Sequence, residues 1–192
     1  MKALGIAGSQ RRGGNTDTLL ARFMEGAASQ GAEIKTIHVC DLKIAACLHC
    51  DACLVSGECQ VQDDMHLVYQ EFNSSDRIVL ASPLHFLSVT AQLKALIDRC
   101  QALWARKYIL KVPPLSEKRE RKGFFISVGG RRTVPNLFEA VLPTIKILFR
   151  TIDVPYAGDI LVPGIDARGD ILKHPEALQA AYLAGQKLIQ DP

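Results

Sequence analysis

Near its N-terminus the chain reads Lys2-Ala3-Leu4-Gly5-Ile6-Ala7, followed directly by Gly8-Ser9-Gln10-Arg11-Arg12-Gly13-Gly14-Asn15-Thr16. The first part is an apolar run of strand length, and the second is rich in glycine and in short polar side chains. The next segment, Thr16–Ser29, has apolar residues at the spacing of one helix face, namely Leu19, Leu20, Phe23 and Met24. This order of strand, glycine turn and helix predicts an α/β fold.

The same alternation continues along the rest of the chain. Further strands are expected at Glu33–Val39, Arg77–Ala81, Gly123–Val128 and Val154–Val162. Helices are expected at Asp64–Phe72, Val89–Leu103, Leu137–Phe149 and Pro175–Ile189. Pro143 should kink or split the third of these helices. Strands alternating with helices form a parallel sheet covered on both faces, so we predict a three-layer, flavodoxin-like sandwich with five strands in the order 2-1-3-4-5.

Two segments interrupt the alternation. One is a cysteine-rich loop at 44–62, and the other is a charged excursion at 106–121 that carries Pro113-Pro114. The excursion joins a helix to a strand by a long route, and we interpret it as part of a subunit contact. Residues 1–192 are otherwise expected to form a single domain.

Composition limits the possible partners and compartments. The formal net charge of +3 is too small to indicate a nucleic-acid partner or a membrane surface. No stretch has the apolar length of a membrane span, and the N-terminal strand lacks the features of a signal peptide. The cytoplasm is therefore expected, where thiols stay reduced and clustered cysteines indicate metal or redox chemistry.

The glycine-rich loop has the features of a phosphate site. A helix N-terminus at the carboxyl edge of a parallel sheet offers unpaired N–H groups and a positive dipole end to an anion. Glycine allows close approach of the backbone, and the remaining residues add donors and charge: Ser9, Arg11 or Arg12, Gly13, Gly14, Asn15 and Thr16. The loop has neither the Gly-Lys-Ser/Thr ending of triphosphate loops nor a Gly-x-Gly-x-x-Gly pattern. It predicts one phosphomonoester, as in FMN; an ordinary strand-to-helix turn is the alternative.

The cysteines of the 44–62 loop are spaced C-x2-C-x2-C-x5-C, at Cys47, Cys50, Cys53 and Cys59. Four thiolates from one loop suit a [4Fe–4S] cluster, which we expect at the same sheet edge as the flavin site. A zinc site, a redox thiol pair and a loop without metal remain alternatives. Cys40 and Cys100 are predicted to be core residues.

With both motifs in place, the chain resembles the NADPH-dependent FMN reductase family and, within it, the iron–sulfur flavoproteins. The resemblance extends nearly from end to end. Beyond the two motifs it includes Asp63-Asp64-Met65, Ser82-Pro83-Leu84-His85-Phe86, Gln92-Leu93-Lys94, Asp98-Arg99, Gly169-Asp170-Ile171 and Pro175-Glu176-Ala177-Leu178. It implies a flavodoxin-like fold, noncovalent FMN, a homodimer or homotetramer, and a [4Fe–4S] cluster close to a flavin, often that of the neighbouring subunit.

The resemblance also implies roles for individual residues. The FMN phosphate would be held by Ser9, Arg11, Gly14, Asn15 and Thr16. The isoalloxazine would lie along Pro83, Leu84, His85 and Phe86, bordered by Gly129, Gly130 and Arg131. The family often has Tyr at the position of His85, and the loop after the fourth strand is shorter here and carries Arg131-Arg132. No catalytic side chain is expected, because the flavin itself carries the hydride or electrons.

Three functions are compatible with these patterns. The four cysteines favour an oxidoreductase that transfers electrons between FMN and a [4Fe–4S] cluster, with NAD(P)H or a ferredoxin-like carrier as donor. A cluster-free NAD(P)H-dependent reductase of flavin or quinone is the first alternative. A flavin-binding redox sensor is the second.

Overall fold

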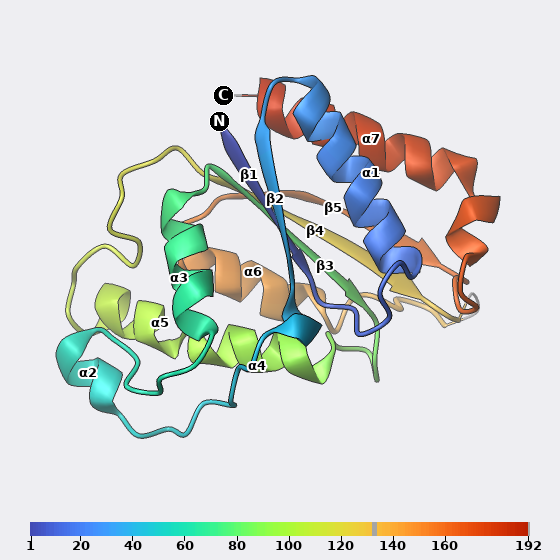
Figure 1. Ribbon diagram of the computed structural model, residues 1–192. Coiled ribbons are helices and arrows are strands. Elements are labelled where there is room, and N and C mark those ends of the chain that lie inside the picture. The colour runs from blue at the N-terminus through green and yellow to red at the C-terminus, as the bar shows by residue number, and fades with distance from the viewer. Residues whose placement is uncertain (132–133, 192) are drawn as a thin grey trace.

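The computed structural model of the chain describes residues 1–131 and 134–191 (Figure 1). Five parallel strands form one sheet in the order β2-β1-β3-β4-β5. The strands are β1 (Lys2–Ala7), β2 (Glu33–His38), β3 (Arg77–Pro83), β4 (Lys122–Gly129) and β5 (Tyr156–Pro163). This confirms the predicted flavodoxin-like topology.

The strands in the middle of the sheet are buried on both faces. β1, β3 and β4 are almost continuously buried, as expected for parallel strands covered by helices on each side. The edge strands β2 and β5 are more exposed, and β2 is also markedly more polar. The strands that are buried throughout therefore lie where the sheet has no free edge.

Two helical layers cover the sheet. The helices α1 (Asn15–Ser29) and α7 (Pro175–Gln190) lie on one face (Figure 1). The opposite face carries α3 (Met65–Ser74), α4 (Ala91–Arg99), α5 (Gln101–Tyr108) and α6 (Leu142–Thr151). Each layer has its own buried apolar cluster, so the sheet separates two cores.

The pair α1 and α7 crosses at two glycines. A Cβ atom on Gly26 would lie 2.0 Å from the carbonyl oxygen of Tyr182, and one on Gly185 would lie 2.0 Å from that of Phe23. Neither position leaves room for a side chain. This backbone contact holds α1 against α7 and so fixes the position of the loop that precedes α1.

Several boundaries differ from the sequence-based expectation. The predicted helix Val89–Leu103 is two helices, α4 and α5, which meet at Cys100. The helix predicted from Leu137 begins at Leu142, because Pro143 occupies its first turn, where a missing N–H costs nothing. A short helix, α2 (Ala52–Ser56), forms inside the cysteine loop.

Short helical turns complete the chain. They are η1 (Val39–Asp41), which directly follows β2, and η2 (Asp170–Lys173), which precedes α7. Cys100 is buried as predicted, but Cys40 lies exposed on η1. The prediction for Cys40 was wrong because β2 ends one residue before the apolar pattern does, and the turn directs Cys40 outward.

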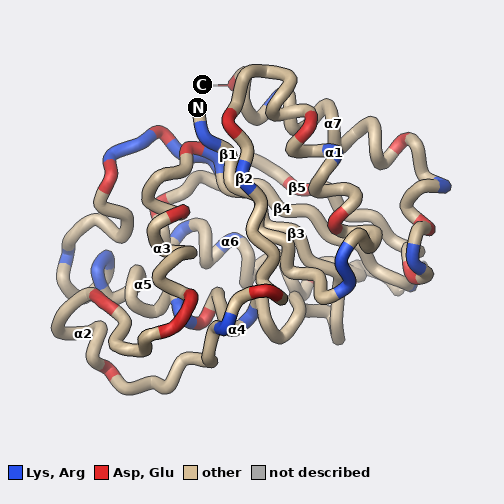
Figure 2. Tube along the Cα trace, viewed as in Figure 1, with Lys and Arg blue, Asp and Glu red and all other residues tan. Residues whose placement is uncertain are grey.

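Charged residues of both signs are distributed around the molecule (Figure 2). The cluster at 118–122 is largely used in local contacts: Arg119 pairs with Asp76 and Glu117, and Arg121 donates to the carbonyl oxygens of Asn73 and Glu117. Within the described ranges no helix has the length and apolarity needed to cross a membrane.

Candidate functional site

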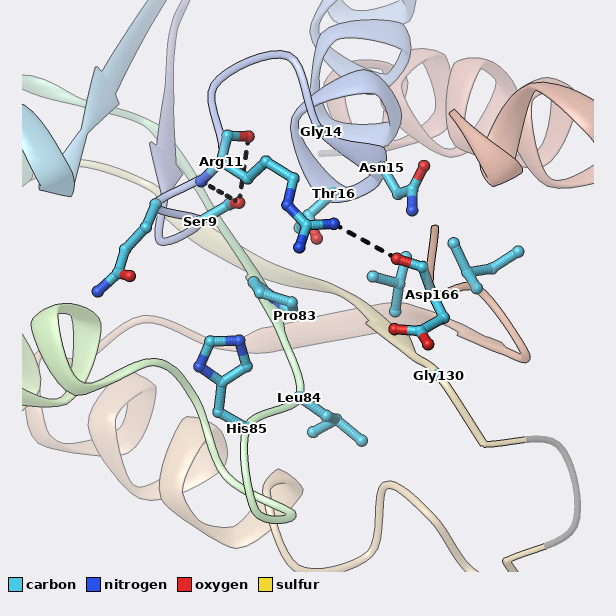
Figure 3. A pocket seen from close by; sticks show the side chains of 13 residues that line it. Ser9, Arg11, Gly14, Asn15, Thr16, Pro83, Leu84, His85, Gly130 and Asp166 are labelled. Atoms are coloured by element: carbon cyan, nitrogen blue, oxygen red, sulfur yellow. Dashed lines mark hydrogen bonds between the residues drawn. The ribbon is translucent and has the colours of Figure 1, made fainter. Parts of the chain in front are cut away.

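A pocket opens at the carboxyl edge of the sheet (Figure 3). It is bounded by the loop between β1 and α1, the segment after β3, the end of β4 and the segment after β5. Its lining residues are Ser9, Gln10, Arg11, Gly14, Asn15, Thr16, Pro83, Leu84, His85, Val128, Gly130, Ile165 and Asp166. The structure thus brings together most of the residues that the sequence assigned to FMN.

The β1–α1 loop is held in place by hydrogen bonds to its neighbours. The N–H of Gly8 donates to the carbonyl oxygen of Ala81 (2.7 Å), and Thr90 Oγ1 donates to that of Gly8 (2.6 Å). A Cβ atom on Gly8 would lie 2.8 Å from a methyl carbon of Leu93 and 3.0 Å from the carbonyl oxygen of Ala81, so a side chain there would force its neighbours to shift. Further along, Gly13 has a φ of 62°, a left-handed conformation that favours glycine.

The start of α1 presents unused donors. Among the described residues no acceptor is found for the backbone N–H groups of Asn15 and Thr16, or for the hydroxyl of Thr16. Arg11 extends across the pocket, and its Nη1 donates to the carbonyl oxygen of Asp166 at 3.4 Å (Figure 3). Helix-terminal N–H groups, a hydroxyl and a guanidinium form a site suited to an anionic group.

The two arginines of the loop have different environments. Arg11 lines the pocket, whereas Arg12 forms an ion pair with Asp41 on η1. The carbonyl oxygen of Arg12 accepts a hydrogen bond from Arg168 Nη2 at 2.7 Å. Arg11 is therefore the member of the pair that can contact a bound anion.

The side chain of Asn15 connects distant parts of the chain. Its Nδ2 donates to the carbonyl oxygen of Ala167 (2.8 Å), and its Oδ1 accepts from the N–H groups of Gly169 (3.0 Å) and Ile171 (3.3 Å). All polar atoms of this nearly buried amide are thus occupied. Asn15 contributes to the pocket through its backbone, while its side chain fastens the segment after β5 to the start of α1.

The segment after β5 is a wall of the pocket that sequence reasoning missed. Ile165 and Asp166 line the pocket, and Ile165 N–H donates to the carbonyl oxygen of Gly129 at 3.0 Å. The sequence signal for this wall is Gly169-Asp170-Ile171, which follows it and is part of the family resemblance. The neighbouring Asp166 carried no pattern of its own.

The residues assigned to the flavin ring are divided between two hollows. Pro83, Leu84 and His85 line the pocket. Phe86 lies outside it, with a φ of 51° and a relative exposure of 106%. It borders an adjoining hollow whose lining residues include Gly129 and Gly130, Arg131, Val134 and Leu137. Arg131 is exposed there. Arg132, which the sequence analysis noted beside it, lies outside the described residues.

Asp17 lies under the β1–α1 loop. Its Oδ2 accepts a hydrogen bond from the N–H of Gly13 (3.0 Å) and lies 3.6 Å from Nδ1 of His38. Burial raises the pKa of Asp17 above its usual value, although Gly13, His38 and Arg12 partly oppose the shift. The loop is therefore supported by a carboxylate that is costly to ionise.

The four cysteines of the 44–62 loop line one hollow, together with Arg99 and the first residues of α5. All are free thiols; Cys50 is exposed and the other three are partly buried. His49 and Asp51, on either side of Cys50, both have left-handed backbone conformations, with φ of 50° and 58°. The backbone there bends sharply in residues for which such conformations carry a cost.

The thiols share a hollow without converging. In the parts of the chain that the structure describes, no three His, Cys, Asp or Glu side chains are gathered closely enough to hold a metal ion. As a donor set, four thiols from one loop suit a [4Fe–4S] cluster or zinc. The loop thus has the chemistry of a metal site, in an arrangement that must contract to bind one.

A buried ion pair lies beneath the cysteine loop. Arg99 donates to both carboxylate oxygens of Asp63, at 2.6 and 3.2 Å, and to the carbonyl oxygens of Ala45 and Val61, each at 3.1 Å. Burial opposes the charge on Asp63, but hydrogen bonds from Arg99 and from backbone N–H groups hold the pKa of this carboxyl below its usual value. Arg99 therefore joins the two ends of the loop.

The pocket at the start of α1 and the cysteine hollow are separate, because none of the described residues lines both. Figure 1 shows that the cysteine loop leaves the end of β2 and runs beside α4 and α5, whereas the pocket is lined by the start of α1. The loop begins at the carboxyl edge, as expected, but carries its cysteines away from the pocket.

A five-stranded sheet with this order, and a loop at the switch point between β1 and β3, defines a protein with a flavodoxin-like fold. The chain belongs to the NADPH-dependent FMN reductase family, which it matches over residues 1–155. Family membership supports FMN as the cofactor of this chain.

Relatives in this family carry a more specific name. The chain is 41% identical to an iron-sulfur flavoprotein of Archaeoglobus fulgidus over 99 residues, covering 52% of this chain and 45% of the relative. It is 34% identical to an iron-sulfur flavoprotein of Methanosarcina thermophila over 132 residues, covering 69% of this chain and 65% of the relative. These matches span about half to two thirds of the relatives' length.

Solved structures show the same fold at low sequence identity. The NAD(P)H:quinone oxidoreductase from Methanothermobacter marburgensis superposes with a TM-score of 0.73 and 16% identity, covering 100% of this chain and 97% of that one. At this identity the likeness concerns the fold alone. It confirms the flavodoxin-like architecture.

Proposed function

We propose that this protein is an FMN-dependent oxidoreductase that transfers electrons between FMN and a [4Fe–4S] cluster held by Cys47, Cys50, Cys53 and Cys59. The observation that carries this proposal is the set of four free thiols around one hollow, in a chain of the FMN reductase family. The similarity to proteins named iron-sulfur flavoproteins supports it.

The pocket supports a specific division of labour toward FMN. The N–H groups at the start of α1, the Thr16 hydroxyl, Ser9 and Arg11 would hold the phosphate. Pro83, Leu84 and His85 would lie along the ring, and Gly129, Gly130 and Arg131 would border it from the end of β4. Bound FMN would supply the two-electron chemistry, which needs no acid or base from the chain.

The cysteine loop supports the cluster through its composition. A [4Fe–4S] cluster there would exchange single electrons, while the protein supplies the thiolates and the charge around them. NAD(P)H or a ferredoxin-like carrier would be the electron donor. Because the thiols are not gathered in the structure, a cluster-free NAD(P)H-dependent reductase of flavin or quinone is the second candidate.

Iron and sulfide analysis after anaerobic reconstitution tests this assignment. The native chain should take up about four irons per chain and lose most of them on Cys50→Ser. Cys40→Ser is the matched control, because Cys40 is also an exposed thiol but lies outside the loop. Acid extraction should release FMN. A native protein that binds FMN and oxidises NAD(P)H but takes up no iron would establish the second candidate instead.

We further propose that the protein works as a homodimer or homotetramer. Among the described residues the pocket and the cysteine hollow share no lining residue, so a second copy would offer a way to bring a cluster close to a flavin. Exposed apolar side chains on the loop and on the excursion, namely Leu48, Val55, Ile109 and Val112, are available for such a contact. Sedimentation of the reconstituted protein at micromolar concentration should show an oligomer, and a monomer would contradict the proposal.

A further inference from the structure

Arg99 is buried, yet part of its guanidinium has no hydrogen-bond partner among the described residues. The residue is 1% exposed, the same as Arg77. Arg77, however, uses its Nε and both terminal nitrogens on carbonyl oxygens, including those of Leu188 and Glu120. Arg99 uses only its terminal nitrogens, and its buried Nε has no hydrogen-bond partner among the described residues.

Arg99 also borders the cysteines, since it lines the same hollow as the four thiols. Although burial lowers the pKa of Arg99, the ion pair with Asp63 and the nearness of the Cys59 thiol raise it on balance. A buried positive charge therefore lies at the wall of the hollow that holds the proposed ligands.

The charge around Arg99 is only partly balanced. Asp63 is its ion-pair partner, and this carboxylate also accepts from the N–H groups of Ala45 (2.9 Å) and Met65 (3.0 Å). The remaining contacts of Arg99 are neutral carbonyl oxygens at 45 and 61. The carboxylate is thus shared among several donors, so it offsets the charge of Arg99 only in part.

We propose that Arg99 is the positioning residue of the cysteine loop and that its charge raises the reduction potential of the [4Fe–4S] cluster held there. This inference rests on the proposed function. Adding an electron makes a thiolate-ligated cluster more negative, and a buried cation or a hydrogen bond to sulfur stabilises that form. Removing the negative charge of Asp63 should raise the reduction potential further, because the positive charge of Arg99 is then no longer offset.

Anaerobic redox titration of the reconstituted protein tests this inference, with dithionite supplying one electron to each cluster and absorbance or EPR as the readout. Arg99→Gln should shift the midpoint potential downward, and Asp63→Asn should shift it upward. Arg99→Lys, which keeps the charge, should restore most of the native value. Lys94→Gln is the matched control. It removes the same positive charge from the same helix, but Lys94 is exposed and paired with Asp98, so solvent screens its charge.

The outcomes separate this inference from the proposed function. Native potentials in both Arg99→Gln and Asp63→Asn, with full iron content, would overturn the role of Arg99 while leaving the cluster in place. A native chain that takes up no iron would overturn both. If Arg99→Gln cannot retain iron, the upward shift in Asp63→Asn and the near-native potential of Arg99→Lys still decide the matter, because disruption of the loop alone would not raise the potential in one variant and leave it near native in the other.

Discussion

The flavin pocket and the cysteine hollow are built in opposite ways. The pocket is framed by the ends of strands and the start of a helix, and backbone hydrogen bonds such as that from Gly8 to Ala81 fix its shape. The cysteine loop is largely irregular, exposes Leu48 and Val55, and is joined to the helical layer by the ion pair of Arg99 with Asp63 and by the contact of α2 with α5. The first site is framed by the sheet, whereas the second is held by one buried ion pair and one short helix.

The largest effect is expected from Asn15→Ala. The substitution leaves three backbone groups of the 167–171 segment without partners, each costing about 1–3 kcal/mol, so we expect a loss of about 3 kcal/mol in the free energy of unfolding. FMN affinity should fall as well, because the wall that carries Asp166 is released. Urea unfolding and FMN titration measure the two effects.

Thr16→Val provides the matched control for that substitution. It keeps the shape of a buried side chain and removes a hydroxyl for which the described part of the chain shows no acceptor. FMN affinity should fall while stability changes little. Equal losses of stability in both variants would mean that the pocket wall is not fastened through Asn15.

This contrast shows what the sequence could reveal about the pocket. The phosphate loop was predictable because its residues are contiguous and their glycines, hydroxyls and position after a strand act locally. The wall at 165–166 was not predictable, because hydrogen bonds to Gly129 and, through the 167–171 segment, to Asn15 hold it at the pocket, and both residues are distant in the sequence. The role of the Asn15 side chain was missed for the same reason.

The cysteine region shows the same limit. The spacing of Cys47, Cys50, Cys53 and Cys59 indicated a common loop, and the structure places the four around one hollow. The ion pair beneath the loop joins Asp63 to the end of α4, and nothing in the local pattern of either residue reveals it. The β-α alternation, by contrast, yielded the strand order directly, because a parallel sheet leaves few ways to connect the same elements.

Replacement of Arg11 tests whether the pocket recognises a phosphate. A charge-assisted hydrogen bond contributes about 1.5–3 kcal/mol, so Arg11→Ala should weaken FMN binding by about 10- to 150-fold. Riboflavin, which lacks the phosphate, should lose much less affinity, and stability should change little because Arg11 is exposed. Calorimetric titration with both ligands decides. Equal losses for FMN and riboflavin would assign Arg11 to the ring instead.

The two regions should also respond to pH in opposite directions. The pKa of Asp63 is lowered in the folded chain, so its contribution to stability is present above the ordinary value of 3.8 and is lost as the pH falls through the folded-state pKa. Asp63→Asn should therefore destabilise the protein at pH 7, by about 1.5–3 kcal/mol, and much less at pH 3.

Asp17 has the reverse sign. Its pKa is raised by burial, so its contribution is present below 3.8 and is lost as the pH rises through the folded-state pKa. Asp17→Asn should therefore increase the free energy of unfolding at pH 7, by less than Asp63→Asn decreases it. This gain should disappear toward pH 3. Urea unfolding at pH 7, 5 and 3 measures both variants, and parallel pH profiles for the two would refute this assignment of signs.

The smallest effect is expected from a substitution at Phe86. The sequence assigned this residue to the flavin site, but it does not line the pocket in the structure. The resemblance placed Phe86 along the flavin ring, yet its side chain is fully exposed beside the adjoining hollow and makes no contribution to either core. Phe86→Ser should therefore change both stability and FMN affinity by no more than about 0.5 kcal/mol, or about twofold in Kd. A loss of tenfold or more in affinity, with unchanged stability, would mean that the 85–88 turn moves Phe86 onto the ring when FMN binds. The pocket would then take its final shape only when FMN binds. Both sites would need a rearrangement to bind their cofactors, and they would differ only in its extent.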